Sequence, residues 1–127
     1  MKRVLIVDDD AAVREVLSSA LTHFGYKAYK ASNGAEAIDV LKANPEIEIV
    51  ILDLKMPVMN GHELCPHLKN LNPNIQIIVS SASIDEMAVK ELNDLGVRCI
   101  LRKPYPLKVL QEAINNHSRC YKIRALT

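Results

Sequence analysis

Residues 4–10 read VLIVDDD, four apolar residues followed by acidic ones. Three of its four apolar residues have β-branched side chains, and three aspartates follow them directly. A short run that is apolar at every position is typical of a strand with both faces covered, as in a parallel sheet between layers of helices. The stretch therefore predicts a buried first strand that leads into acidic groups at its carboxyl end.

The rest of the chain alternates between apolar runs and amphipathic segments of helical length. Strands are expected at 3–7, 26–31, 47–52, 75–80 and 97–101. Helices are expected at 11–24, at 34–43 behind an Asn33 cap, and at 61–70, 84–95 and 106–117. Asp10 is interpreted as the cap of the first helix. This alternation predicts the α/β class, with helices on both faces of a parallel sheet.

Length and composition limit the class of protein. The 127 residues, 49% of them hydrophobic, fit one domain with a single core. Lys plus Arg number 16 and Asp plus Glu 15, so no global charge favours nucleic acid or an anionic membrane. No apolar run approaches a membrane span, and the N-terminus has no secretory apolar segment. Because Cys65, Cys99 and Cys120 form no CxxC pair, we expect simple reduced cysteines in a cytoplasmic protein.

Polar side chains follow every strongly apolar strand. Asp8 and Asp9 follow the first strand, Asp53 the third, Ser81 the fourth and Lys103 the fifth. Carboxyl ends of parallel strands share one edge of a sheet, where ligands bind, so these groups are expected to converge. Each residue alone would be an ordinary turn, cap or surface residue. Their joint position at different strand ends favours a functional site.

The chemistry of this set indicates phosphoryl transfer. Carboxylates a few ångströms apart resist joint ionisation unless a cation lies among them, and oxygen ligands suit a hard divalent metal such as Mg²⁺. Transfer of a phosphoryl group needs an in-line nucleophile and neutralisation of charge on the equatorial oxygens. Asp53 can attack, Lys103 and a metal can neutralise, and Ser81 can donate a hydrogen bond.

Four separated motifs resemble the receiver domains of two-component response regulators over residues 2–117: VLIVDDD at 4–10, ILDLKMPVMNG at 51–61, SSA at 80–82 and KP at 103–104. The resemblance implies a flavodoxin-like, doubly wound sheet of five parallel strands in the order 2-1-3-4-5, with five helices. It also implies a receiver domain at residues 1–118, followed at 119–127 by a tail or the start of a linker.

The same resemblance implies a signalling domain and not an enzyme. The domain would accept a phosphoryl group from the phosphohistidine of a sensor histidine kinase or a histidine phosphotransfer protein. It would promote its own phosphotransfer and dephosphorylation, and switch conformation. An effector domain or a homodimer partner would receive the signal, with no direct binding of nucleic acid or membrane by this domain.

The resemblance also assigns roles to individual residues. Asp53 would be the phosphoacceptor, Ser81 the switch hydroxyl and Lys103 the partner of the phosphoryl group. Asp9 would bind the metal directly, and Asp8 would lie near it or bind it through water. The bond before Pro104 would be cis. The full ligand set implied for Mg²⁺, or Mn²⁺, is Asp8, Asp9, Asp53 and the main-chain carbonyl of Lys55.

Three positions depart from the family pattern. Ile100 stands where an aromatic switch residue is usual, so coupling between a hydroxyl and a ring is not expected here. Pro66 falls inside the third helix, where a missing hydrogen bond predicts a kink or a late start. Pro106 replaces the usual hydroxyl-bearing cap of the last helix, although proline also opens helices well.

Three alternative functions can be compared by the residues that each would require at the motif positions. A pseudo-receiver, which binds partners without being phosphorylated, remains the alternative, although the presence of Asp53, Ser81 and Lys103 argues against it. A phosphohydrolase of the haloacid dehalogenase type would need an acid where Lys55 stands. A nucleotide-binding domain would need a glycine-rich turn after the first strand, and none of the four glycines is there.

Overall fold

Five parallel strands form a single sheet in the order β2-β1-β3-β4-β5. The computed structural model describes residues 2–54, 61–82, 84–97 and 99–115. The strands are β1 (Arg3–Val7), β2 (Lys27–Ala31), β3 (Ile49–Leu52), β4 (Gln76–Ser81) and β5 (Cys99–Arg102). The helices are α1 (Ala11–His23), α2 (Gly34–Ala43), α3 (Gly61–Leu71), α4 (Glu86–Asp94) and α5 (Leu107–Asn115). The predicted α/β class and strand order are confirmed.

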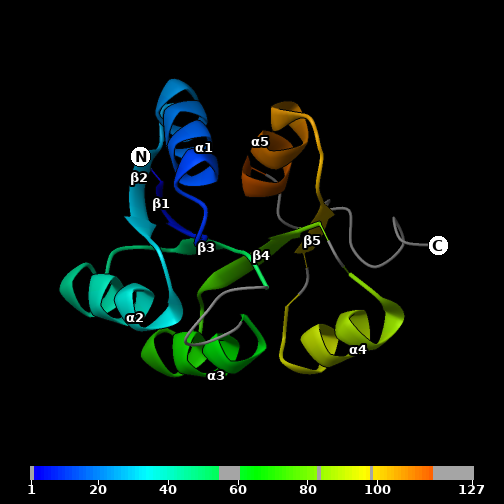
Figure 1. Cartoon of the computed structure of the whole chain (residues 1–127). Helices are drawn as coiled ribbons and strands as arrows, with labels where there is room; N and C mark the ends of the chain where they lie inside the picture. The colour runs from blue at the N-terminus through cyan, green and yellow to red at the C-terminus, as the bar shows by residue number, and fades with distance from the viewer. Residues whose placement is uncertain (1, 55–60, 83, 98, 116–127) are drawn as a thin grey trace.

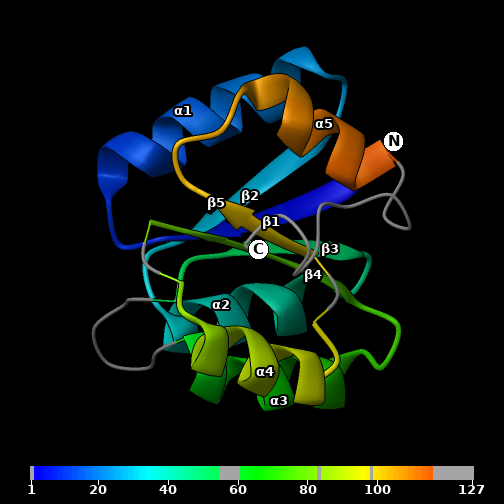
Figure 2. The same ribbon diagram turned by 90° about the vertical axis from the view of Figure 1, so that its right-hand side faces the viewer.

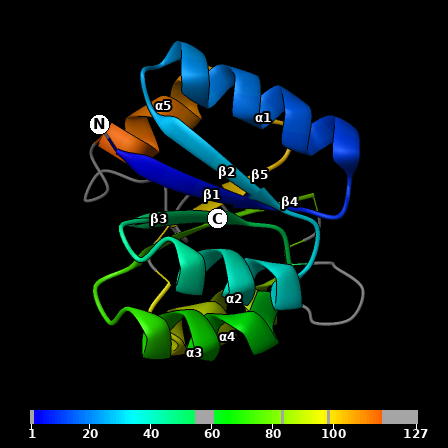
Figure 3. The same cartoon turned by 90° about the vertical axis from the view of Figure 1, so that its left-hand side faces the viewer.

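The sheet lies between two layers of helices (Figure 1). α1 and α5 cover one face, and α2, α3 and α4 cover the other, as the two side views show (Figure 2, Figure 3). Val4 and Ile6 of β1 belong to the core beneath α1 and α5, whereas Leu5 and Val7 belong to the opposite core. All of them are fully buried. Alternating side chains on a sheet covered on both faces therefore explain the uninterrupted apolar run.

Three predicted strands begin too early for a shared physical reason. Ile47, Ile75 and Val97 are apolar and buried, and the pattern assigns them to strands. Their amides instead donate to carbonyls at the end of the preceding helix or turn: Ile47 to Asn44 (3.1 Å), Ile75 to Asn72 (3.0 Å) and Val97 to Leu92 (2.9 Å). Each residue fills the core while it closes a turn, so β3, β4 and β5 start after it.

Side-chain caps set the ends of the helices. Asp10 caps α1 as predicted, and its carboxylate accepts a hydrogen bond of 2.9 Å from the amide of Ala12. α4 is shorter than the predicted 84–95 because Asp85 caps it, accepting from the amide of Ala88 at 2.7 Å, and Gly96 follows with a φ of 88°. Within the described ranges, no helix is long and apolar enough to cross a membrane.

Pro66 lies inside α3, which runs as one helix from Gly61 to Leu71. The late start is therefore ruled out, and the kink at Pro66 stays a prediction. Leu64, Cys65 and Leu68 on this helix are fully buried. Burial of this apolar face outweighs the one backbone hydrogen bond that proline cannot make.

The cysteines differ from one another. Cys65 is buried and carries a free thiol, whose pKa is raised by burial to about 11. Cys99 is buried and disulfide-bonded, so the prediction of three reduced cysteines is wrong. Distance along the chain does not reveal which sulfur atoms meet in the fold, because a disulfide depends on the separation of the backbone positions in space. Cys120 lies outside the described residues.

Candidate functional site

The site residues extend the backbone ladder of the sheet by one step. The amide of Asp8 donates to Ala31 at 3.2 Å, and the amide of Asp53 donates to Val7 at 3.0 Å. The amide of Lys103 donates to the carbonyl of Ser81, also at 3.0 Å. Each of these residues directly follows its strand or ends it, and each is still bonded to a neighbouring strand. The sheet itself therefore fixes where the functional side chains begin.

Three carboxylates meet at this edge. Asp8, Asp9 and Asp53 each offer a ligand oxygen, and these oxygens all lie within 4.8 Å of one another. Asp8 is buried, Asp9 is exposed, and the side chain of Asp53 is 14% exposed. Oxygen donors at this spacing fit a hard divalent cation. The predicted convergence of the acids is present, and Asp53 remains accessible from solvent.

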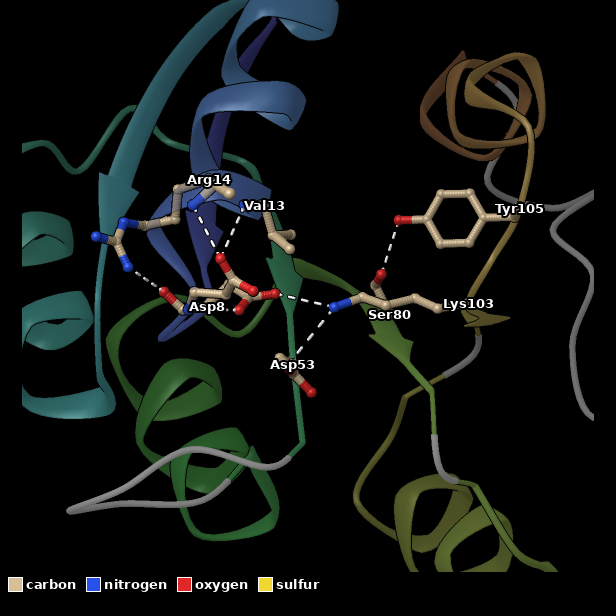
Figure 4. A network of polar contacts seen from close by, with 9 residues as sticks. Asp8, Val13, Arg14, Asp53, Ser80, Lys103 and Tyr105 are labelled. Carbon is tan, nitrogen blue, oxygen red and sulfur yellow. Dashed lines mark hydrogen bonds and ion pairs between the residues drawn. The ribbon is translucent and has the colours of Figure 1, made fainter.

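Lys103 reaches between two of these acids (Figure 4). Its Nζ lies 3.0 Å from Oδ2 of Asp8 and 3.7 Å from Oδ2 of Asp53. Burial is the largest single influence on the pKa of Lys103 and lowers it, but the hydrogen bond to Asp8 and the charges of Asp8 and Asp53 together raise it overall. The ammonium therefore stays charged at neutral pH and offsets part of the repulsion among the acids.

Asp8 is held by further contacts that orient it. Its Oδ1 accepts from the amide of Asp10 at 2.9 Å, and its main-chain carbonyl accepts from Nη1 of Arg14 at 2.7 Å. Figure 4 shows the arginine folding back from α1 onto the end of β1. The motifs do not single out Arg14, because an arginine in the first turn of a helix is usually a surface residue. Only its short distance along the chain from Asp8 hints at this contact.

Two neighbouring serines end β4 and play different structural parts. Ser81 is buried, and its carbonyl holds the amide of Lys103. Ser80 is also buried, and its Oγ lies 2.7 Å from the phenol oxygen of Tyr105 in a hydrogen bond that either atom can donate. Burial raises the pKa of Tyr105, which the hydrogen bond and the charge of Lys103 oppose only in part. Sequence patterns give no signal for this pair, since nothing links the two positions before the chain folds.

The remaining predicted positions have mixed outcomes. The bond between Lys103 and Pro104 is cis, as the resemblance implied. Ile100 is buried with 3% exposure in the core beneath α2, α3 and α4. Lys55, expected to offer a carbonyl ligand, lies outside the described residues. α5 begins at Leu107, directly after Pro106.

Comparison with known proteins places the chain in a family. The model of the response regulator receiver domain matches residues 4–115. The chain is 38% identical to the chemotaxis protein CheY of Thermotoga maritima, covering 93% of this chain and 98% of that one. It is 30% identical to sporulation initiation phosphotransferase F of Bacillus subtilis, covering 91% and 93%. A solved CheX–CheY–BeF3–Mg²⁺ complex from Borrelia burgdorferi is similar, with a TM-score of 0.83 and 32% identity over 90% of this chain and 87% of that one. This chain therefore belongs to the response regulator receiver domains, a family of signalling domains.

Proposed function

We propose that the domain accepts a phosphoryl group on Asp53 from a phosphohistidine, in a reaction that depends on Mg²⁺ or Mn²⁺, and then switches conformation to signal downstream. One observation carries this proposal. A part-exposed carboxylate lies within 4.8 Å of two others, and a lysine ammonium lies 3.7 Å from it. Such a site has a nucleophile, a place for a cation and a fixed positive charge, which are the parts that phosphoryl transfer needs.

Asp53 supplies the nucleophile. One of its carboxylate oxygens would attack phosphorus, forming a P–O bond while the P–N bond to the donor imidazole breaks and its electron pair stays on the ring nitrogen. Lys103, which donates to Asp8 at 3.0 Å in the resting site, would turn toward the new phosphoryl oxygens. Ser81 would donate a hydrogen bond to the same group. The resulting phosphoaspartate would later hydrolyse, so the domain would also reset itself.

The acids would hold the metal, which when bound supplies positive charge against the phosphoryl oxygens. Asp9 and Asp53 would be direct ligands. Both carboxylate oxygens of Asp8 already accept hydrogen bonds, one from the amide of Asp10 and one from Lys103, which supports a nearby or water-mediated role for Asp8. The Lys55 carbonyl is proposed as a further ligand from the family motif alone.

Partners follow from the family, whose members interact with histidine kinases and effector domains. We assign the donor to a sensor histidine kinase or a histidine phosphotransfer protein, and the output to an effector domain or a second copy. The name of the Bacillus phosphotransferase and the BeF3 and Mg²⁺ of the Borrelia complex support this assignment. The receiver unit would span residues 1–118 of a cytoplasmic protein, with a tail or linker beginning at 119.

Mass spectrometry of the intact protein tests the proposal directly. The protein is incubated with a small acyl phosphate and Mg²⁺, and it should gain one phosphoryl group. Asp53→Asn and addition of a chelator should each abolish the gain. Asp39→Asn, an exposed aspartate on α2, is the matched control and should be phosphorylated like the parent. A parent that gains no phosphoryl group would favour the pseudo-receiver.

A further inference from the structure

The hydrogen bond between Ser80 and Tyr105 joins two segments that each carry a site residue. Ser80 directly precedes Ser81 at the end of β4, and Tyr105 follows Lys103 by two positions. The hydroxyl oxygens are 2.7 Å apart although the residues are separated by 25 positions in the chain. Figure 4 shows the phenol pointing at the serine from the segment between β5 and α5. The bond thus ties this segment to β4.

The pair lies beside the acid cluster and does not enter it. Ile78 belongs to the core beneath α1 and α5, and side chains alternate along a strand, so Ser80 faces the same way. Tyr105 packs against that same core. The phenol and the serine therefore lie on the α1 and α5 side of the sheet, where Figure 4 shows them joined to each other.

Lys103 is consequently held at two points. Its own amide donates to the carbonyl of Ser81 at 3.0 Å, and Tyr105 anchors the chain two residues later. Between these anchors the side chain must place its ammonium 3.0 Å from Asp8 and 3.7 Å from Asp53. A hydroxyl as buried as that of Ser80, with 1% exposure, needs a partner, so the second anchor is costly to release.

We propose that Ser80 and Tyr105 are positioning residues, whose hydrogen bond holds Lys103 in place between Asp8 and Asp53. The consequence for phosphorylation rests on the proposed function of Asp53, whereas the consequence for the Lys103–Asp8 contact does not. The side chain of Ile100, on β5, has no hydroxyl and cannot form a hydrogen bond to β4. Tyr105, in the segment after β5, makes such a bond through Ser80.

The first test measures phosphorylation by a small acyl phosphate with Mg²⁺ in Tyr105→Phe, Ser80→Ala and the double variant. Each single variant should react about 3- to 10-fold more slowly, which corresponds to the loss of one hydrogen bond. Because both changes remove the same bond, the double variant should be no slower than the slower single variant. Rates are compared at a temperature where thermal unfolding shows every variant to be folded.

Tyr29→Phe is the matched control. Tyr29 is on β2, at the far side of the sheet order from β4 and β5. The substitution removes a phenol hydroxyl that accepts a hydrogen bond from Nη1 of Arg3 at 3.0 Å and lies 3.4 Å from Oε1 of Glu46. This variant should react at the parental rate. Parental rates in Tyr105→Phe and Ser80→Ala, or fold-losses that multiply in the double variant, would overturn the proposal.

A second measurement separates this inference from the proposed function, because it involves no phosphoryl group. Urea unfolding is compared for the parent, Lys103→Met, Tyr105→Phe and Lys103→Met/Tyr105→Phe in metal-free buffer. If Tyr105 positions Lys103, the double variant should lose less free energy of unfolding than the sum of the losses in the two single variants. Strictly additive losses would overturn the positioning role even in a protein that is phosphorylated. If the parent is not phosphorylated, the proposed function fails while the non-additivity still decides the role of Tyr105.

Discussion

Lys103 donates a hydrogen bond of 3.0 Å to Asp8 across 95 positions of the chain. The carboxylate side chain that receives it is only 4% exposed, whereas the lysine side chain is 25% exposed. A buried carboxylate without a counter-charge is costly, so the lysine stabilises the fold before any phosphoryl group arrives. Lys103 thus stabilises the unphosphorylated protein, in addition to the role proposed for it in phosphorylation.

Replacing Lys103 by methionine should destabilise the metal-free protein. We expect Lys103→Met to lower the free energy of unfolding by about 1–3 kcal/mol, between the effect of a surface pair and that of a fully buried pair. Urea unfolding measures this value. Lys30→Met is the control, because it breaks an ion pair of similar length, 2.8 Å to Glu15, whose residues are exposed. Equal losses in the two variants would show that the burial of Asp8 is irrelevant.

Magnesium should raise the melting temperature by binding only the folded site. At ten times its dissociation constant we expect an increase of about 3–6 °C in the parent. Asp53→Asn should lose most of this increase, and Asp39→Asn should keep it. Thermal unfolding followed by circular dichroism gives the three shifts. A shift of the same size in both variants would place the bound metal away from the acid cluster.

Cys65 should make the protein less stable in alkali. Its folded pKa is about 11, whereas the unfolded thiol ionises near pH ~8.5–9, so the folded state retains a proton that the unfolded state releases. The stabilisation is complete below the unfolded pKa and is lost as pH rises toward the folded one. Between pH 8 and pH 10.5 the parent should lose up to about 2 kcal/mol more than Cys65→Ala. Identical pH slopes in urea unfolding would contradict the buried-thiol explanation.

Restoring an aromatic residue at position 100 should destabilise the resting fold. Ile100 is 3% exposed, and a tyrosine ring in a filled core forces its neighbours apart. We expect Ile100→Tyr to lower the free energy of unfolding by about 1–3 kcal/mol, and Ile100→Leu, which conserves volume, by less than about 1.5 kcal/mol. Chemical denaturation compares the two. A tyrosine variant as stable as the parent would mean that the ring has found room outside the core.

Much of the site could be predicted because strand ends in a parallel sheet share an edge. The apolar runs locate the strands. The residues that directly follow β1, β3 and β5, which are Asp8, Asp53 and Lys103, must then lie close together. The start of each strand is predicted less well. An apolar residue such as Ile75 satisfies the core equally well as the last residue of a turn, so hydrophobicity alone cannot place the boundary.

The supporting contacts could not be predicted, for a different reason. The bond from Arg14 to the carbonyl of Asp8 and the bond between Ser80 and Tyr105 depend on side-chain directions that exist only after the layers have packed. The disulfide at Cys99 is of the same kind. In each case the sequence around the two groups contains no pattern that predicts the contact between them.

Backbone hydrogen bonds at the carboxyl ends of the strands fix the register of the site residues. Insertions should therefore be tolerated better at the amino ends of the strands than within them. Asp53 is fixed through its amide to Val7, and Lys103 through its amide to Ser81. One residue inserted within β3 would turn Asp53 toward the opposite face of the sheet and remove it from Lys103. An insertion in the turn before Ile75, at the far end of the strands, would leave every site residue in register. Loop grafting, tags and reporter insertions therefore belong at the amino ends of the strands.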